Sequence, residues 1–205
     1  MKSREILDLY LTKKYAAQKS EFTEVDMQFL AVYSIERSPR STNEILRSLG
    51  YCKGGEQTYY AEKPLVKKVK EDIQGLYSRF HSLKSRDENA FNQDFVQFLE
   101  WYCSNLDAGG RCHCYYCNVD EATLLHAFDK TTGVLSSKKR SFNATLQIDQ
   151  KLPNAGYNKD NCVMACVLCN NAKSDMISAE DFKKYIAPSM AAYWEHIKTE
   201  MSKKD

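Results

Sequence analysis

The stretch that decides the fold is "IDQKLPNAGYNKDN", residues 148–161, which is followed at once by "CVMACVLCNNAK", residues 162–173. The alternating segment "SFNATLQID" predicts a strand that ends near Asp149. Pro153 and Gly156 mark a loop, "NCVMAC" predicts a second short strand, and "CNNAKSD" predicts a helix. The sequence therefore predicts a compact unit of strand, loop, strand and helix.

The sequence contains two Cys-x2-Cys pairs. Cys114 and Cys117 lie upstream of this unit, and Cys166 and Cys169 lie at its second strand and predicted helix. Two residues between thiolates let both reach one ion from a tight turn, and four thiolates complete a closed tetrahedral shell. Because such a shell leaves no open position, we expect the zinc to be structural rather than catalytic. Three further residues are close enough in the sequence to replace one of these four cysteines as a zinc ligand: Cys112, His113 and Cys162.

The bulk composition limits the possible functions. The chain has 205 residues, eight cysteines and a net charge of +2, so binding to nucleic acid must come from local basic patches. We find no apolar run long enough for a membrane span and no secretory signal, and we expect a cytoplasmic protein. Its cysteines then favour metal binding over disulfides, with Cys52, Cys103 and Cys162 as small buried hydrophobes.

Residues 1–87 are predicted to form a helical first domain. Ser41 and Glu44 have the spacing of a capping box before a short helix that Gly50 closes. A turn-rich segment, "YCKGGEQTYY", follows, and a basic helix is predicted to begin at Pro64. Two interpretations stay open, a helix-turn-helix-like module that reads duplex DNA and a plain helical bundle with a solvated lysine face.

Residues 88–205 are predicted to form the second domain. The segment "NQDFVQFLEWYCSN" predicts an aromatic-rich helix, and "LDAGG" ends it. After the cysteine-rich unit, Ser178 and Asp181 have a capping pattern, and the helix that follows is expected to break or kink at Pro188.

The ordered motif resembles the HNH, or ββα-metal, nuclease family. The residues that carry the resemblance are Asp149, Gly156, Tyr157, Asn161, Cys166, Cys169, Asn170 and Lys173, with "CYYC" upstream. The resemblance covers residues 91–183 and is strongest to the zinc-bound branch that includes restriction endonucleases such as PacI. It implies an α+β fold, with a zinc-pinned ββα-metal, treble-clef-like core, a mainly helical N-terminal region and a C-terminal helix.

The resemblance also implies roles for individual residues. Asp149 and Asn170 match the pair that holds the catalytic ion, and two oxygen ligands with several waters suit Mg²⁺ or Mn²⁺. Asn161 matches the residue that braces the loop, and Lys173 is implied to lie near the scissile phosphate. The alternative for these positions is the ordinary turn and cap chemistry that Asp and Asn favour.

Gln150 occupies the position at which the family usually carries its histidine base. A neutral amide accepts no proton near neutral pH, although it can orient a water molecule. One account places the base elsewhere, with His126 preferred, then His113, and with His81 and Tyr157 as further candidates. In a second account the metal generates the nucleophile without a protein base, and in a third the site is inactive.

The predicted function is a divalent-metal-dependent DNA endonuclease of the restriction type that hydrolyses phosphodiester bonds. The basic cluster Lys138, Lys139 and Arg140 is expected to hold DNA phosphates, the alternative being a solvated loop. Double-stranded DNA is the expected partner, and a palindromic site would imply a homodimer. Alternatives are a catalytically inactive zinc-containing DNA-binding protein, a scaffold domain without nucleic acid, and a homing or phage nuclease; RNA is a second possible substrate.

Overall fold

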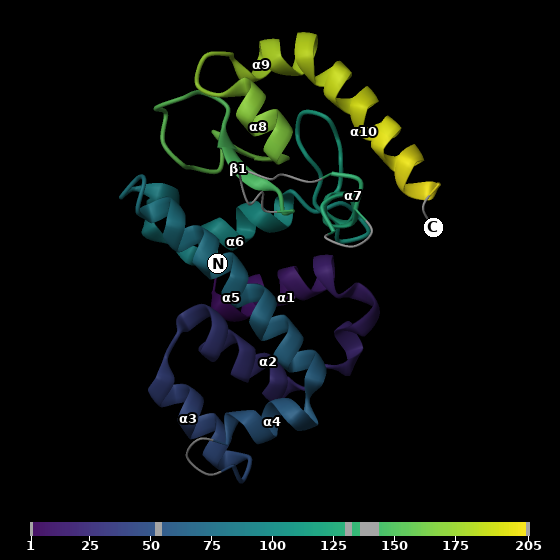
Figure 1. The fold of residues 1–205 in the computed structure, drawn as a ribbon. Helices are drawn as coiled ribbons and strands as arrows, with labels where there is room; N and C mark the ends of the chain where they lie inside the picture. Colours follow the sequence, from purple (N-terminus) through teal and green to yellow (C-terminus); the bar gives the residue numbers. More distant parts are fainter. Residues whose placement is uncertain (1, 52–54, 130–132, 136–143, 204–205) are drawn as a thin grey trace. The chain divides into compact units, whose positions relative to one another are not determined.

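The computed structural model describes residues 2–51, 55–129, 133–135 and 144–203. The chain divides into two compact units, unit 1 (Met1–Ser104) and unit 2 (Asn105–Asp205) (Figure 1). Helix α6 (Phe95–Ser104) goes with unit 1, where it packs against helix α1 (Ser3–Lys14). The division into domains 1–87 and 88–205 stays a prediction.

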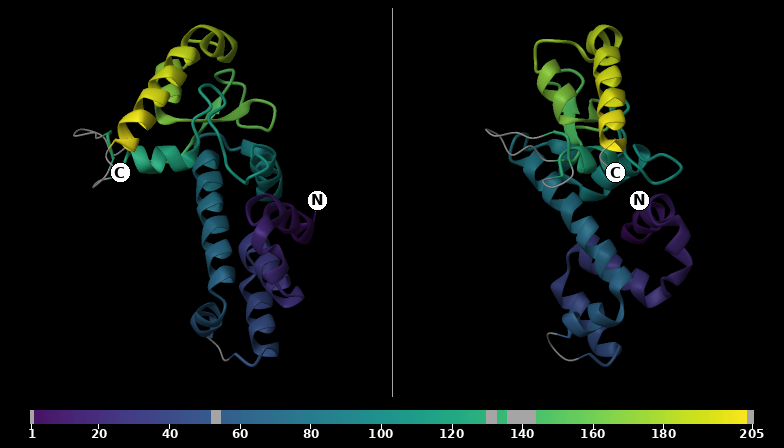
Figure 2. Two further views of the ribbon diagram at one scale, coloured as in Figure 1. Left: turned by 90° about the vertical axis from the view of Figure 1, so that its right-hand side faces the viewer. Right: turned by 45° about the vertical axis from the view of Figure 1, so that its right-hand side comes forward.

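Unit 1 is a bundle of helices around an apolar core. Its α-helices are α1 (Ser3–Lys14), α2 (Glu24–Leu30), α3 (Pro39–Ser48), α4 (Glu56–Glu62), α5 (Pro64–Lys84) and α6 (Phe95–Ser104). Short 3-10 helices span Ala16–Glu21 and Ala90–Gln93, and α2 continues as a π-helix over Ala31–Glu36. The long helix α5, prominent in both views of Figure 2, buries Val66, Val69, Ile73, Leu76 and Phe80 at helical spacing.

The helix ends of unit 1 follow the sequence signals only in part. Gly50 has φ +85 and closes α3, and α5 begins at Pro64, as predicted. The capping box predicted at Ser41 was wrong, because Ser38 caps α3 and accepts a hydrogen bond from the Ser41 amide at 3.4 Å. Pro39, whose fixed φ suits the first helical turn, starts the helix three residues earlier.

The segment predicted as a turn-rich break contains helix α4. Tyr59 and Tyr60 on this helix are buried, and the Tyr59 hydroxyl donates to the buried carboxylate of Asp26 at 2.6 Å. Tertiary packing therefore outweighs the local turn signals there. Neither the DNA-reading nor the plain-bundle interpretation of unit 1 is decided by this arrangement, and both stay predictions.

Unit 2 holds the predicted strand–strand–helix core, which is confirmed. Strand β1 (Gln147–Gln150) pairs antiparallel with strand β2 (Cys162–Ala165), so that Asp149 lies opposite Val163. Helix α8 (Val167–Lys173) follows β2 directly and packs on β1. Strand β1 is shorter than the predicted one, because residues 144–146 do not pair and residues 141–143 lie outside the described residues.

The remaining helices of unit 2 support this core. They are α7 (Glu121–Ala127), α9 (Ala179–Asp181) and α10 (Ala187–Ser202), and a π-helical stretch, Phe182–Ile186, joins the last two. Ser178 caps α9, as predicted, and accepts from the Asp181 amide at 3.0 Å. Pro188 is the second residue of α10, which continues directly from the π-helical stretch. In Figures 1 and 2, α10 (yellow) runs beside α8.

Across the part of the chain that the structure describes, no helix is long and apolar enough to span a bilayer. Cys103 and Cys162 are buried, in agreement with their predicted role as small core residues. Cys52 lies outside the described residues.

Candidate functional site

The four predicted cysteines form one buried cluster. The sulfur atoms of Cys114, Cys117, Cys166 and Cys169 all lie within 4.8 Å of one another. Cys166 caps α8 and its sulfur accepts from the Cys169 amide at 3.4 Å, so the start of the helix supplies half of the cluster. The predicted ligand set is therefore the one that converges.

This cluster fits a structural zinc. All four side chains are buried, and cysteine thiolates are among the ligands that zinc prefers. Four converging sulfurs supply a complete tetrahedral shell. The cluster thus can hold a metal that stabilises the fold, and a closed shell of this kind has no position for substrate.

The face of β1 that meets α8 carries the candidate active site. Gln147 and Asp149 point to the same face of the strand, because side chains alternate along it. Asn170 and Lys173 lie one turn apart on the facing side of α8. The Asn170 amide donates to Gln147 Oε1 at 2.7 Å, and Lys173 Nζ lies 3.3 Å from Asp149 Oδ1. Asp149 and Asn170, the predicted metal ligands, therefore belong to one strand–helix interface.

Asp149 is 8% exposed, and charged and polar partners surround its carboxylate. The Tyr116 hydroxyl donates to Oδ2 at 2.6 Å. Burial, together with the hydrogen bond to Asp149, raises the pKa of Tyr116, so the phenol stays protonated and acts as the donor. Lys173 lies 3.3 Å from each carboxylate oxygen and supplies the counter-charge that a buried carboxylate requires.

Lys173 is only 1% exposed. Besides Asp149, its ammonium contacts the carbonyl oxygens of Gln150 at 2.9 Å and Ser174 at 3.2 Å. The phosphate contact predicted for Lys173 would require the ammonium to leave these acceptors. In this state the side chain serves as the internal counter-ion of Asp149.

Asn161 ties the hairpin loop together from inside. Its amide nitrogen donates to the carbonyls of Leu152 at 3.0 Å and Gly156 at 2.9 Å, and its Oδ1 accepts from the Leu152 amide at 2.9 Å. The side chain is buried, so these three bonds are sheltered from water. The loop that follows Asp149 thus has a fixed shape, while the contribution of Asn161 to catalysis stays a prediction.

Gln150 is the last residue of β1, next to Asp149. The alternation of the strand directs its side chain to the face opposite Asp149, and its carbonyl is an acceptor for Lys173. The catalytic role predicted for Gln150 stays a prediction.

His113 is held within the first cysteine knuckle, the turn that contains Cys114 and Cys117. Its Nε2 lies 2.9 Å from Asp107 Oδ2, and its Nδ1 lies 3.3 Å from the carbonyl oxygen of Asn118. Hydrogen bonds from the Arg111 amide and from His113 hold the pKa of Asp107 well below its usual range. Because both ring nitrogens face acceptors, His113 would have to break one contact to act as a base.

The other proposed bases lie on different elements. His126 is half-buried in the last turn of α7, and Tyr157 lies on the hairpin loop. His81 belongs to α5 in unit 1. The identity of the base therefore stays a prediction. The predicted phosphate-binding residues Lys138, Lys139 and Arg140 lie outside the described residues.

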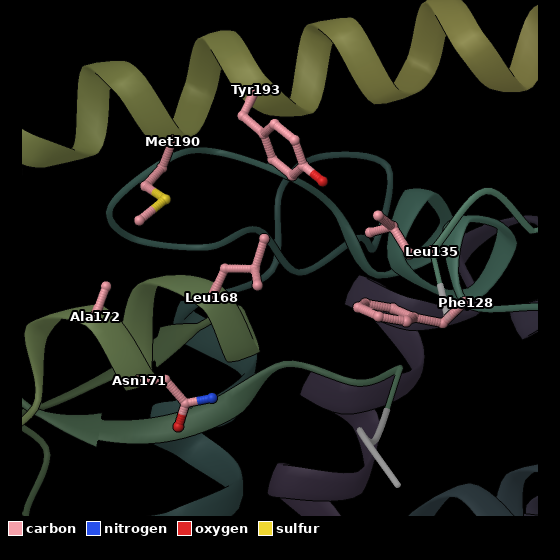
Figure 3. A pocket seen from close by; sticks show the side chains of 7 residues that line it. All are labelled: Phe128, Leu135, Leu168, Asn171, Ala172, Met190 and Tyr193. Atoms are coloured by element: carbon pink, nitrogen blue, oxygen red, sulfur yellow. The ribbon is translucent and has the colours of Figure 1, made fainter. Parts of the chain in front are cut away.

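A separate apolar cavity of about 560 Å³ lies on the other side of α8 (Figure 3). Its lining residues are Phe128, Leu135, Leu168, Asn171, Ala172, Met190 and Tyr193. At about 100° per residue, Ala172 lies about 100° and Leu168 about 140° from Lys173 around the axis of α8, so both point away from Lys173. This cavity is thus distinct from the Asp149 site, and the described residues that line it include no carboxylate or histidine.

Two residues of the site were missed by sequence reasoning. Tyr116 was seen only as a spacer between Cys114 and Cys117, and Gln147 only as part of a strand. Strand alternation was the available signal for Gln147, which shares a face with Asp149. No local signal identifies Tyr116, because its partner Asp149 lies 33 residues away in the sequence.

Together, the antiparallel hairpin, the helix that follows it and the buried cysteine cluster define a cysteine-pinned ββα core. Among solved structures, the chain is similar to the rare-cutting HNH restriction endonuclease PacI, with 24% sequence identity and a TM-score of 0.44. The match covers 59% of this chain and 78% of the PacI chain. No family model and no curated protein matches the chain.

Proposed function

We propose that this protein is a divalent-metal-dependent DNA endonuclease that hydrolyses phosphodiester bonds, in the manner of an HNH-type restriction enzyme. The observation that carries the proposal is the buried carboxylate of Asp149, which meets Lys173 in the β1–α8 interface that also holds the hydrogen bond between Asn170 and Gln147. Lys173 and Tyr116 compensate this buried charge in the metal-free state, and carboxylate oxygens are also the ligands that a hard divalent cation prefers.

The donor set of the site suits Mg²⁺ or Mn²⁺. Asp149 and Asn170 would hold the ion through oxygen atoms, which are the ligands that both cations prefer. When bound, the ion would supply a nucleophilic water and stabilise the charge that develops on the phosphate. Because Lys173 already neutralises Asp149, a cation would bind in competition with this ammonium.

The side chains of this protein would perform the remaining tasks. Tyr116 holds the Asp149 carboxylate, and Asn161 fixes the loop that follows it. Lys173, once released from Asp149, would carry a positive charge next to the bound phosphate. His126, or His113 after release from Asp107, would take the proton from the attacking water.

Double-stranded DNA is the substrate class in this proposal. The phosphates would be held by Lys138, Lys139 and Arg140, and two copies acting as a homodimer would cut the two strands of a palindromic site. The cysteine cluster would hold zinc and keep the hairpin and α8 in register.

The test is to incubate the purified protein with supercoiled plasmid and phage DNA in the presence of EDTA, Mg²⁺ or Mn²⁺. We expect discrete metal-dependent fragments that disappear in Asp149→Ala. The matched control is Asp160→Ala, which changes an exposed aspartate on the hairpin loop and should leave the fragments unchanged. Cutting by Asp149→Ala at the wild-type rate would contradict the proposal.

A second candidate is a DNA-binding protein with an inactive nuclease core. Two observations favour it: Gln150 replaces the usual base, and Lys173 occupies the carboxylate that the ion needs. It predicts DNA binding without cutting, in the presence or absence of metal. Recovery of cutting in Gln150→His would identify an HNH site inactivated at the base.

A further inference from the structure

Tyr116 lies in the middle of the first cysteine knuckle, between Cys114 and Cys117. The knuckle is tied to the hairpin by a main-chain bond, in which the Tyr115 amide donates to the Met164 carbonyl at 2.7 Å. The main chain that carries the Tyr116 ring is therefore fixed at two places, by the sulfur cluster and by strand β2.

The ring of Tyr116 is also fixed along its length. It is 6% exposed and packs edge-on against Phe182, with ring centroids 5.1 Å apart. It also contacts the ring of Tyr115, with centroids 5.2 Å apart. Because the side chain has only two torsions and the ring packs against two aromatic neighbours, the position of its hydroxyl is restricted.

The hydroxyl donates to a single oxygen of Asp149. Tyr116 contacts Oδ2 at 2.6 Å, whereas Lys173 lies at 3.3 Å from both oxygens and does not distinguish between them. The hydrogen bond from Tyr116 therefore decides which way the carboxylate is turned. It directs Oδ2 to the knuckle, so that Oδ1, which accepts from Lys173 at 3.3 Å, is the oxygen available to a cation once the ammonium has moved.

We propose that Tyr116 is a positioning residue that transmits the fixed geometry of the four-cysteine knuckle to the carboxylate of Asp149 and so presents Oδ1 to the catalytic cation. This inference rests on the proposed function for its cation, but the bond between Tyr116 and Asp149 can be tested separately. In this proposal the structural zinc also contributes to the geometry of the active site. The turn that supplies two of its ligands orients Asp149, which is the proposed ligand of the catalytic ion.

The experiment compares Tyr116→Phe with Tyr115→Phe in the full chain loaded with zinc. Both variants lose one hydroxyl from the same knuckle, but Tyr115 is 40% exposed and its ring lies under the ammonium of Lys183. Electron paramagnetic resonance of added Mn²⁺ measures binding without any turnover. We expect Tyr116→Phe to bind Mn²⁺ about 10–100-fold more weakly than wild type, and Tyr115→Phe to match wild type.

Zinc content, and the absorption spectrum of the Co²⁺-substituted knuckle, should be the same in both variants. Wild-type Mn²⁺ affinity in Tyr116→Phe would overturn the inference. Loss of zinc from Tyr116→Phe would overturn it too, because the residue would then stabilise the knuckle rather than position Asp149.

Absence of Mn²⁺ binding to the wild type would instead count against the proposed function and its catalytic ion. In that case the hydrogen bond between Tyr116 and Asp149 is tested by a double-mutant cycle. The thermal midpoint of unfolding is measured for Tyr116→Phe, for Asp149→Asn and for the double variant. Non-additive shifts would support a bond that positions the carboxylate, and additive shifts would overturn it.

Discussion

At the scale of single residues, the first prediction concerns the stability that Lys173 contributes. Its ammonium is buried against Asp149, and removal of one partner of such a pair leaves the other charge unpaired. We expect Lys173→Met to lower the free energy of unfolding of the metal-free protein by about 3 kcal/mol, measured by urea denaturation. We also expect Mn²⁺ to stabilise this variant more than the wild type, because the ion no longer competes with an ammonium.

The control for this prediction is Lys198→Met, which removes an ammonium that is 40% exposed and pairs with Glu195 at 2.7 Å. A surface pair of this kind contributes about 0–1 kcal/mol, so the variant should behave like wild type. An unchanged stability in Lys173→Met would show that the buried pair is not what holds Asp149.

The residue scale also shows which parts of the site the sequence could predict. The cysteine cluster was predicted because both Cys-x2-Cys spacings are local and each brings two sulfurs together within one turn. The contact between Tyr116 and Asp149 was not, because it depends on how the knuckle packs on the hairpin. Lys173 was expected beside a phosphate, and only the fold reveals that its ammonium lies inside the protein.

At the scale of elements, the hairpin loop depends on Asn161. Its side chain makes three hydrogen bonds to the main chain of the loop and is buried, so an alanine there leaves polar groups without partners. We expect Asn161→Ala to cost about 2–3 kcal/mol in the free energy of unfolding. Hydrogen exchange at the Leu152 amide, which donates to Asn161 Oδ1, should become faster.

Asn158→Ala is the matched control, since Asn158 also makes three hydrogen bonds within the same loop, at 3.0–3.2 Å. Asn158 is half-buried, so water can replace part of what its side chain provides, and the cost should be smaller. Equal costs in the two variants would contradict the special role of Asn161.

The elements themselves were predictable to different degrees. The hairpin and helix α8 follow from local alternation and turn residues, which agree with the tertiary structure there. Helix α4 was missed, since the burial of Tyr59 and Tyr60 against unit 1 outweighs a composition that favours turns. Helix α3 begins earlier than predicted, because Ser38 as cap and Pro39 in the first turn form a better helix start than Ser41 with Glu44.

At the scale of the whole molecule, the two compact units should respond differently to loss of metal. Unit 1 has a continuous apolar core of its own, which includes the fully buried Val69, Ile73 and Phe98. Unit 2 relies on a two-stranded sheet of four-residue strands, which is marginal without further support. A structural zinc contributes about 10–16 kcal/mol on binding, comparable to the total stability of a domain.

We therefore expect a strong zinc chelator to abolish amide-exchange protection in β1, β2 and α8 while α5 and α6 stay protected, as measured by mass spectrometry. Cys166→Ser should have the same effect as the chelator. Cys103→Ser is the control, because this buried cysteine belongs to α6 of unit 1 and is not one of the four clustered cysteines. Full retention of protection in unit 2 after zinc removal would mean that its short strands are held by packing alone, and that Tyr116 could then orient Asp149 without any metal in the knuckle.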